Sequence, residues 1–177
     1  MQVMKSSAGE IPMAEPLAYF LTWPTYGTWL PGDQRGWVQY HRGHQLPDPV
    51  LEREAQARME EEACILDRTQ RDIVEKTIQD HCEIPQWKLF AVNCRSNHLH
   101  VVVGAKVHPD EIRKQLKAWA TRHLKAHQKL TTGHDGNLRT NWWAERGSGR
   151  YINDEDSLEA AIIYVQEGQG RQTEDCP

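Results

Sequence analysis

The amino-acid sequence predicts an α+β fold, in which helices cover an antiparallel sheet. Apolar runs of strand length, rich in β-branched and aromatic residues, alternate with segments whose apolar residues recur at helical spacing. Their order along the chain is strand, helix, strand, strand, helix, strand, which is the βαββαβ pattern of a ferredoxin-like sheet. One further helix follows at the C-terminal end and completes the predicted architecture.

The composition indicates one globular domain spanning residues 1–177. Hydrophobic residues make up 38% of the chain and charged residues 26%, and no apolar run approaches the ~20 residues of a membrane span. Residues 1–15 lack the apolar core of a secretion signal and are expected to form a flexible lead-in, and residues 170–177 a tail. The four cysteines form no C-x-x-C pair, so reduced thiols are expected, and with them a cytoplasmic location and no membrane partner.

The net charge of −4 conceals an uneven distribution. Residues 51–83 carry a balance of −5 and residues 153–177 a balance of −6, whereas residues 84–152 carry +8. A basic block of this size inside an acidic protein favours a nucleic-acid partner. The seven tryptophans, against two phenylalanines, add residues that can stack on bases as well as fill a core.

The strands are predicted as follows. Residues 17–23 form a buried strand, and residues 86–94 and 98–105 form a hairpin around the turn 95–97. Residues 141–152 form a strand or hairpin interrupted by Gly147-Ser148-Gly149. Residues 24–49, rich in Gly, Pro and Trp, form a structured loop of a length that is often functional.

Three helices are predicted. The first runs from about residue 50 to 81. The second opens at Pro109, followed by Asp110 and Glu111 where the helix dipole favours carboxylates. Its core stripe contains Ile112, Leu116, Trp119, Ala120, His123 and Leu124, and its other side carries Lys114, Lys117, Arg122, Lys125 and Lys129, with Arg113 at the boundary. That side is either a solvated face or a phosphate-binding face, and six cations without an interleaved acid favour the second.

The third helix starts at the cap Asn153 and runs to about Glu167, before Gly168. Its core stripe consists of Leu158, Ala161, Ile162 and Val165. Tyr164 lies about 110° from the centre of that stripe. A tyrosine at such a boundary either packs as an amphipathic residue or is placed to act as a nucleophile.

The sequence His98-Leu99-His100 lies in the third strand, inside the basic block. Residues two apart on a strand point to the same face, so two imidazoles would project about 6–7 Å apart at the backbone. At that spacing they can share one divalent cation, although such a pair can also lie on a surface with no role.

The order of these features resembles the single-tyrosine transposases of the HUH nuclease superfamily, in which HUH stands for His–hydrophobic–His. The matching parts are the segment 97–102, the basic helix, Trp142-Trp143 with Gly147 and Tyr151, and the segment 164–169. The segment 25–33 is similar to a subgroup related to the REP-associated tyrosine transposases. The resemblance covers about residues 17–170, and its specificity comes from the order and spacing of the motifs together.

The resemblance implies a mechanism. His98 and His100 would hold Mg²⁺ or Mn²⁺, and Tyr164 would attack a DNA phosphate to leave a 5′-phosphotyrosine link and a free 3′-OH. The implied substrate is single-stranded DNA recognised through a hairpin, in a bacterial cytoplasm at the nucleoid, and related enzymes can be homodimers.

The chain departs from the family pattern at the third metal ligand. The family places a Gln or Asn four residues after the tyrosine, where this chain has Gly168, with Gln169 one residue later. Gln169 can serve as the ligand if the helix ends or loosens at the glycine. Glu167 is the geometric substitute, since i+3 lies about 60° from Tyr164 on a helix.

Besides Arg113, Lys114, Lys117, Arg122 and Lys125, we expect DNA contacts from Arg95, Trp29 and Trp37, although Arg95 can equally face water. His123 and His127 are expected to be structural or surface residues, and Asp33 and Arg35 to form a structural ion pair. Two other classes of function stay open: a DNA-binding module that has lost cleavage, and a ferredoxin-like domain that acts on RNA.

Overall fold

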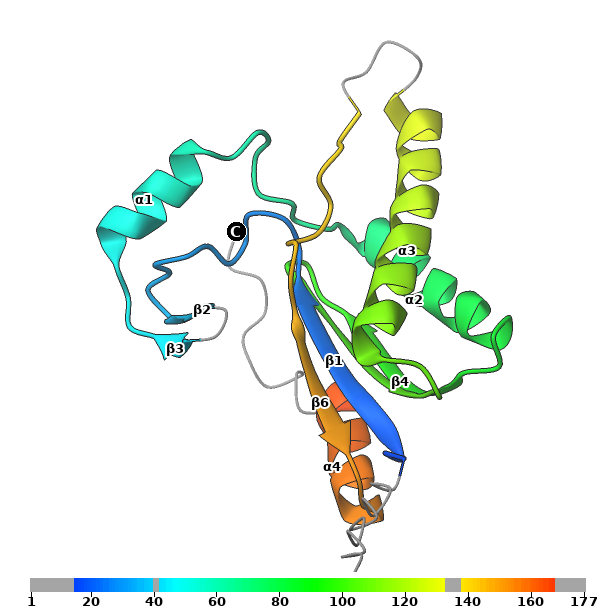
Figure 1. Cartoon of the computed structure of the whole chain (residues 1–177). Coiled ribbons are helices and arrows are strands. Elements are labelled where there is room, and N and C mark those ends of the chain that lie inside the picture. The colour runs from blue at the N-terminus through cyan, green and yellow to red at the C-terminus, as the bar shows by residue number, and fades with distance from the viewer. Residues whose placement is uncertain (1–14, 40–41, 133–137, 168–177) are drawn as a thin grey trace, which may run out of the picture.

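The computed structural model describes residues 15–39, 42–132 and 138–167. Its main sheet contains β1 (Ala18–Pro24), β4 (Lys88–Cys94), β5 (His98–Gly104) and β6 (Ser148–Ile152), in the order β4-β5-β1-β6. All three neighbouring pairs are antiparallel. The predicted α+β fold with a four-stranded antiparallel sheet is therefore confirmed (Figure 1).

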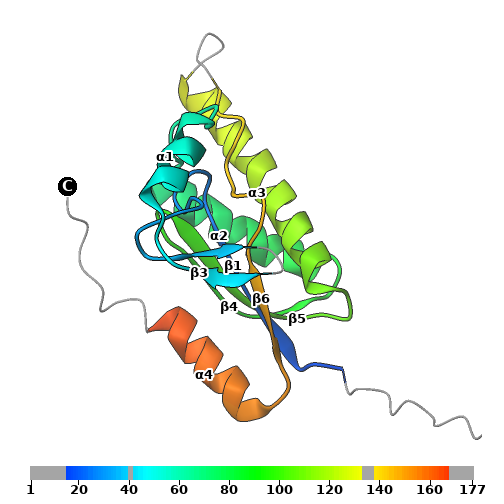
Figure 2. The same cartoon turned by 60° about the vertical axis from the view of Figure 1, so that its left-hand side comes forward.

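Helices cover both faces of this sheet. The helices α2 (Arg68–Glu83) and α3 (Pro109–Thr132) pack on one face and against each other. The C-terminal helix α4 (Glu155–Gln166) packs on the other face, against β4 and β5 (Figure 2). None of the helices in the described ranges has the length and apolar character needed to cross a bilayer.

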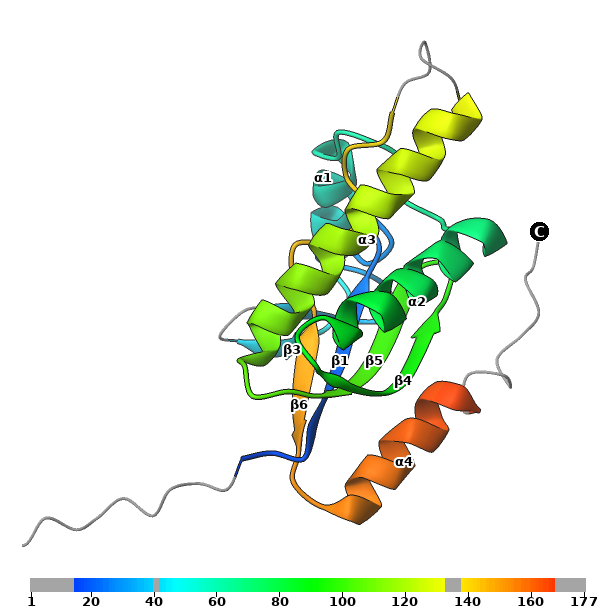
Figure 3. The ribbon, with the colours of Figure 1, turned by 90° about the vertical axis from the view of Figure 1, so that its right-hand side faces the viewer.

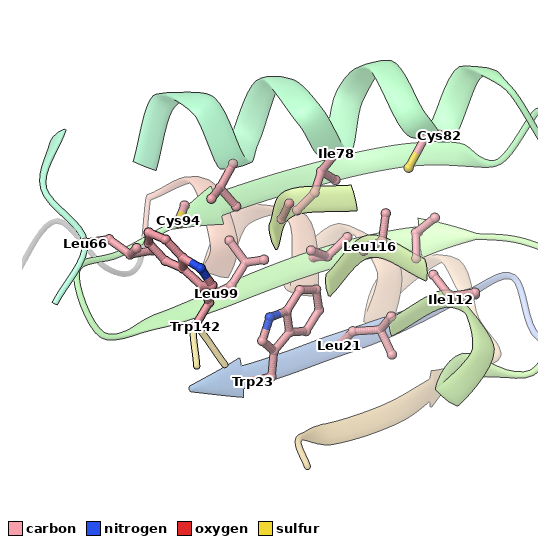
Figure 4. Packing of buried hydrophobic residues seen from close by; sticks show 14 of the residues in the cluster. Leu21, Trp23, Leu66, Ile78, Cys82, Cys94, Leu99, Ile112, Leu116 and Trp142 are labelled. Atoms are coloured by element: carbon pink, nitrogen blue, oxygen red, sulfur yellow. The ribbon is translucent and has the colours of Figure 1, made fainter. Parts of the chain in front are cut away.

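The alternation of side chains along the strands fills a separate core on each face. Leu21 and Trp23 of β1, with Leu99 of β5, point toward α2 and α3, where they meet buried residues such as Ile78 and Leu116 (Figure 4). The smaller core under α4 contains Ala18, Val102, Ile152, Ala161 and Val165, with Leu158 and Ile162 partly buried beside it. The predicted apolar stripe of the last helix is thus confirmed.

The predicted helix over residues 50–81 is wrong, because the chain forms two helices there. The first is α1 (Pro49–Ala57), and α2 starts afresh after the N-cap Asp67. Asp67 and Gln70 form a reciprocal capping box, which satisfies backbone donors at the start of α2. Between the helices, Cys64 and Leu66 are buried, and their N–H groups donate to the carbonyls of Tyr26 and Ser96.

The predicted strand over residues 141–152 is also shorter than expected. Only Ser148–Ile152 forms β6, and Trp143 makes a single isolated bridge with Thr25. The segment before β6 lies close to β1 at Gly147, where an added Cβ would lie 2.4 Å from the carbonyl oxygen of Thr22. Glycine is required there because of this close approach.

Three further expectations change in detail. Residues 24–49 contain a small antiparallel pair, β2 (Trp37–Gln39) and β3 (Gly43–Gln45), instead of a loop alone. In α3 the buried residues are Ile112, Leu116, Ala120 and Leu124, whereas Trp119 is half-buried and His123 exposed. The last helix is capped by Asp154, one residue later than predicted.

Lys117 of α3 holds the segment before β6 in place. Its Nζ donates to the carbonyl oxygens of Ala144 at 2.7 Å, Glu145 at 3.2 Å and Arg146 at 3.4 Å. Burial and the neighbouring Arg113 lower the pKa of the Lys117 amine to about 8. The assignment of Lys117 to DNA binding is therefore corrected, because its donors are used inside the protein.

We expect Lys117→Met to lower the free energy of unfolding by about 1–3 kcal/mol, because these carbonyls lose their charged donor. Lys129→Met, on the exposed surface of the same helix, is the matched control and should change stability by less than ~0.5 kcal/mol. Urea denaturation followed by circular dichroism measures both. Equal free energies of unfolding for the two variants would show that Lys117 does not stabilise the segment before β6.

Candidate active site

His98 and His100 lie on the face of β5 that α4 covers. Leu99, between them, points into the opposite core. The two imidazole ring centres are 4.7 Å apart, with an angle of 79° between the ring planes. The predicted side-by-side projection from one strand is therefore present in the fold.

The ring of His100 is held from the neighbouring strand. Thr22 of β1 is its partner in the register, and Thr22 Oγ1 lies 2.7 Å from His100 Nδ1. The residue is only 7% exposed, and this burial, together with His98 and Arg95, lowers the pKa of His100 to about 4. At neutral pH His100 is thus an uncharged imidazole, which is the form that binds metals.

His98 is oriented by the residue before it. Asn97 Oδ1 lies 2.6 Å from His98 Nδ1, so the tautomer with a proton on Nδ1 donates this hydrogen bond to the amide oxygen. The backbone of Asn97 is fixed in turn: its carbonyl oxygen accepts from Thr25 N at 2.9 Å, Thr25 Oγ1 at 3.1 Å and Thr28 Oγ1 at 3.0 Å. The loop after β1 therefore holds the turn that presents His98.

The histidine pair fits a shared divalent cation. Two imidazoles bound at right angles through metal–nitrogen bonds of ~2.1 Å would have ring centres roughly 4.6 Å apart, close to the 4.7 Å found here. Among the described residues, no three His, Cys, Asp or Glu side chains gather around one point that could hold a metal. Glu167, exposed at the C-terminal cap of α4, does not complete the site, and Gln169 lies outside the described residues.

Tyr164 of α4 lies beside this pair. Its ring centre is 5.7 Å from that of His100 and 5.9 Å from that of Phe20, both in edge-to-face geometry. The side chain is 49% exposed, so a polymer phosphate can approach its hydroxyl. The fold thus places next to the histidines the tyrosine that the sequence analysis singled out.

Three residues of the site were missed by sequence reasoning. Phe20 stacks on His100 at 5.5 Å, and the Arg150 guanidinium lies 5.6 Å from the Phe20 ring centre. Asn93 of β4 donates from Nδ2 to the carbonyl oxygen of Val165 at 3.0 Å, which ties the end of α4 to the sheet. Each of them lies in a segment predicted as a strand, but the strand order that brings the three together was not visible in the sequence.

The basic helix lies on the far side of the sheet from this site (Figure 3). Arg113 is paired with Asp110, and the Arg122 guanidinium lies 4.6 Å from the ring centre of Trp119. Lys114 is exposed and Lys125 half-buried. The predicted DNA contacts of α3 therefore stay a prediction, and they would lie away from the histidines.

The remaining predicted residues lie near the loop after β1 and the hairpin turn. Trp29 is 45% exposed, and its Nε1 donates to the carbonyl oxygen of Gly36 at 2.8 Å. Trp37 is half-buried, with an Nε1 that finds no partner among the described residues. The predicted ion pair of Asp33 and Arg35 is confirmed at 2.6 Å, and it lowers the pKa of the Asp33 carboxyl.

The low pKa of His100 predicts how stability depends on pH. The unfolded chain binds a proton at this imidazole below about pH 6.5, whereas the folded protein does so only near pH 4. The free energy of unfolding therefore falls as the pH drops through this window, by at most about 3 kcal/mol from this group. Urea denaturation at pH 7, 6 and 5 in EDTA should show a smaller fall for His100→Gln than for the wild type. If the free energy of unfolding falls equally with pH in both proteins, the lowered pKa of His100 is contradicted.

The sequence matches no protein-family model and no curated protein. Among solved structures, the fold is similar to a candidate transposase from Deinococcus radiodurans R1, with a TM-score of 0.48 and 18% identity over 94% of this chain and 98% of that one. It is also similar to a REP-associated tyrosine transposase bound to a REP hairpin, with a TM-score of 0.47 and 12% identity over 90% of this chain and 70% of that one. At these identities and TM-scores, neither match establishes a function for this chain.

Proposed function

We propose that this protein is a single-stranded DNA nicking and joining enzyme of the transposase type, with Tyr164 as its nucleophile. The observation that carries the proposal is the meeting of Tyr164 with the histidine pair, because β5 and α4 are far apart in the sequence and come together only in the fold. An exposed phenol beside two imidazoles in a metal-binding arrangement suits phosphoryl transfer.

The proposed cleavage is an in-line displacement at one phosphodiester. Tyr164 Oη attacks the phosphorus, a phosphorus–phenol oxygen bond forms, and the bond from phosphorus to the 3′ oxygen breaks. The phenol loses its proton and the departing 3′ oxygen gains one, so a 5′-phosphotyrosine and a free 3′-OH result. A 3′-OH of a second strand reverses these steps and joins the strands without a nucleotide cofactor.

His98 and His100 would hold Mg²⁺ or Mn²⁺ in this reaction, with Gln169 as the proposed third ligand. When bound, the cation supplies positive charge at a non-bridging phosphate oxygen and at the departing 3′ oxygen. Thr22 and Asn97 keep the two imidazoles oriented for that task. Asn93 keeps the end of α4, and with it Tyr164, against the sheet.

The proposed substrate is single-stranded DNA flanked by a hairpin. Arg150 and Arg95 place positive charge around the site, and Trp29 offers an exposed aromatic face beside the Arg35 guanidinium, which lies 5.5 Å from its ring centre. This arrangement suits an unpaired strand, whose bases are free to stack.

The experiment uses single-stranded oligonucleotides that cover the DNA flanking the gene, including its hairpins, labelled at either end. With Mn²⁺, we expect a protein–DNA species that survives SDS and carries the 3′ label, while the 5′ label appears on a shortened free strand. The species should not form when EDTA removes the metal, or when duplex DNA or RNA of the same sequence replaces the single-stranded DNA. An SDS-resistant species carrying the 5′ label would contradict the proposed polarity.

A cleavage-deficient binding module is the second candidate. It is favoured by the lack of a third His, Cys, Asp or Glu ligand beside the histidines among the described residues. Such a protein would bind hairpin DNA with steep salt dependence and leave it intact under any metal. Adding Mn²⁺ to the wild type and to His98→Ala separates the two, because only an enzyme loses an activity in the variant.

A further inference from the structure

A cavity of about 280 Å³ lies at the start of α2, beside the end of β4 and the turn that leads to His98. Its wall is rich in guanidinium groups and contains fewer carboxylates than cations. The side chains that line it include Arg68, Arg71, Arg95, Asp72, Glu75 and Asn93.

Two arginines of this cavity, Arg68 and Arg71, have no paired carboxylate within the described residues. The Nε of Arg71 is buried and has no hydrogen-bond partner among the described residues. Within the same ranges, neither Arg68 nor Arg71 makes an ion pair, although Asp72 and Glu75 lie in the same wall. Burying a guanidinium nitrogen without a partner is costly, so an external acceptor is expected.

One of the two carboxylates is already engaged. Glu75 Oε1 accepts the backbone N–H of Cys94 at 2.6 Å, at the last residue of β4. This bond fixes the end of the strand and uses acceptor capacity that could otherwise have paired with an arginine. Asp72 is exposed and forms no ion pair with Arg68 or Arg71 within the described residues.

The cavity shares one lining residue, Asn93, with the candidate active site. Asn93 lines it and at the same time donates to the carbonyl oxygen of Val165, the residue next to Tyr164. Asn93 is also the register partner of His100. Figure 3 shows the end of α4, the end of β4 and the start of α2 on the same side of the molecule.

We propose that Arg68, Arg71 and Arg95 form a phosphate-binding subsite that holds the backbone of the single-stranded DNA beyond the scissile phosphate. The subsite rests on the proposed function for its ligand. Guanidinium groups bind phosphate oxygens through paired N–H donors, and the buried Nε of Arg71 gains the acceptor it lacks. The shared chemistry is that of a phosphate oxyanion, and the DNA phosphodiester is its source.

The test compares DNA binding of the double variant R68Q/R71Q with that of R58Q/K76Q. The control removes the same charge from exposed positions of α1 and α2, where Arg58 and Lys76 pair with Glu54 and Asp80. Fluorescence anisotropy with a labelled single-stranded oligonucleotide in EDTA gives the Kd between 50 and 300 mM NaCl without cleavage. Circular dichroism verifies that each variant is folded.

We expect R68Q/R71Q to raise the Kd at least ~10-fold and to lower the slope of log Kd against log salt by about 1.4, because each of the two lost phosphate contacts removes about 0.7 from it. R58Q/K76Q should change the Kd less than ~2-fold. R71K keeps the charge but loses the paired donors. Its Kd should lie between the Kd values of R68Q/R71Q and R58Q/K76Q. Equal Kd and slope for R68Q/R71Q and R58Q/K76Q would overturn the subsite.

Inorganic phosphate separates the two sources of the ligand. If the Nε–H signal of Arg71 in NMR shifts saturably with inorganic phosphate while R68Q/R71Q binds DNA like the control, DNA is overturned as the ligand. Failure of the proposed function gives a different result. The wild type then forms no covalent adduct with DNA, whether or not R68Q/R71Q weakens DNA binding in the anisotropy experiment. With both ideas correct, R68Q/R71Q still forms the adduct at saturating DNA and needs more DNA to reach half of its maximum.

Discussion

Tyr164→Phe is expected to lower the yield of covalent DNA adduct at least ~10³-fold, since loss of a catalytic nucleophile commonly costs that much or more. The substitution removes only the hydroxyl, and the ring contacts with His100 and Phe20 remain. The side chain is half exposed, so the free energy of unfolding should change by less than ~0.5 kcal/mol. Binding of single-stranded DNA in EDTA should be unchanged within ~2-fold. A gel with 3′-labelled DNA measures the yield.

Tyr151→Phe is the matched control for this variant. Tyr151 is 51% exposed, close to the value for Tyr164, but it packs edge-to-face on Tyr19 at the other side of the sheet. Its adduct yield should equal that of the wild type. A Tyr164→Phe protein that forms the adduct as well as Tyr151→Phe would remove Tyr164 from the chemistry.

His98→Ala is the second substitution with a large expected effect. The loss of one of the two proposed imidazole ligands should lower the adduct yield at least ~100-fold, because charge stabilisation by a bound cation is worth several kcal/mol. The effect should weaken at high Mn²⁺, since the remaining ligands bind the cation less tightly. Titration of Mn²⁺ against adduct yield measures both the maximum and the midpoint.

The neighbouring histidine needs a different substitution, because it is buried. His100→Gln keeps most of the volume under α4 and is expected to have the same effect on adduct yield with a modest loss of stability. His123→Ala, on the exposed surface of α3, serves as the control and should leave yield and midpoint unchanged. Metal titrations of His98→Ala that overlay those of His123→Ala would argue against a histidine-bound cation.

Much of the sheet could be predicted because the signals were local. The β-branched run after His100 and the alternation around it fix β5 and the face that the histidines share. The stripe of α4 fixes the boundary position of Tyr164 in the same way. These features depend on neighbouring residues in the sequence, and the structure agrees with them.

The division of residues 50–81 into two helices was missed because no Gly or Pro interrupts that stretch after Val50. A signal did exist: Asp67 and Gln70 have the spacing of a capping box, which marks a helix start. The break matters for function, because it puts Arg68 and Arg71 in the first turn of α2, at the cavity beside the site.

The surroundings of the histidines could not be predicted from local patterns. Thr22 and Phe20 contact His100, and Arg150 contacts Phe20, only because β1 lies between β5 and β6, and this order is a property of the whole fold. For the same reason the sequence could not show that the sheet separates the basic face of α3 from the histidines. The histidines and tyrosine were thus predictable as residues, and the partners that orient them were not.

The most direct test of the site is to locate the covalent bond in the wild-type adduct. After digestion with nuclease and trypsin, mass spectrometry should find a nucleotide attached through its 5′ phosphate to the peptide 151–171. This peptide contains both Tyr151 and Tyr164, so fragment ions must assign the residue. The structure predicts modification of Tyr164, in the presence of Mn²⁺ and not in EDTA. A nucleotide on Tyr151 or on any other residue would contradict the proposed active site.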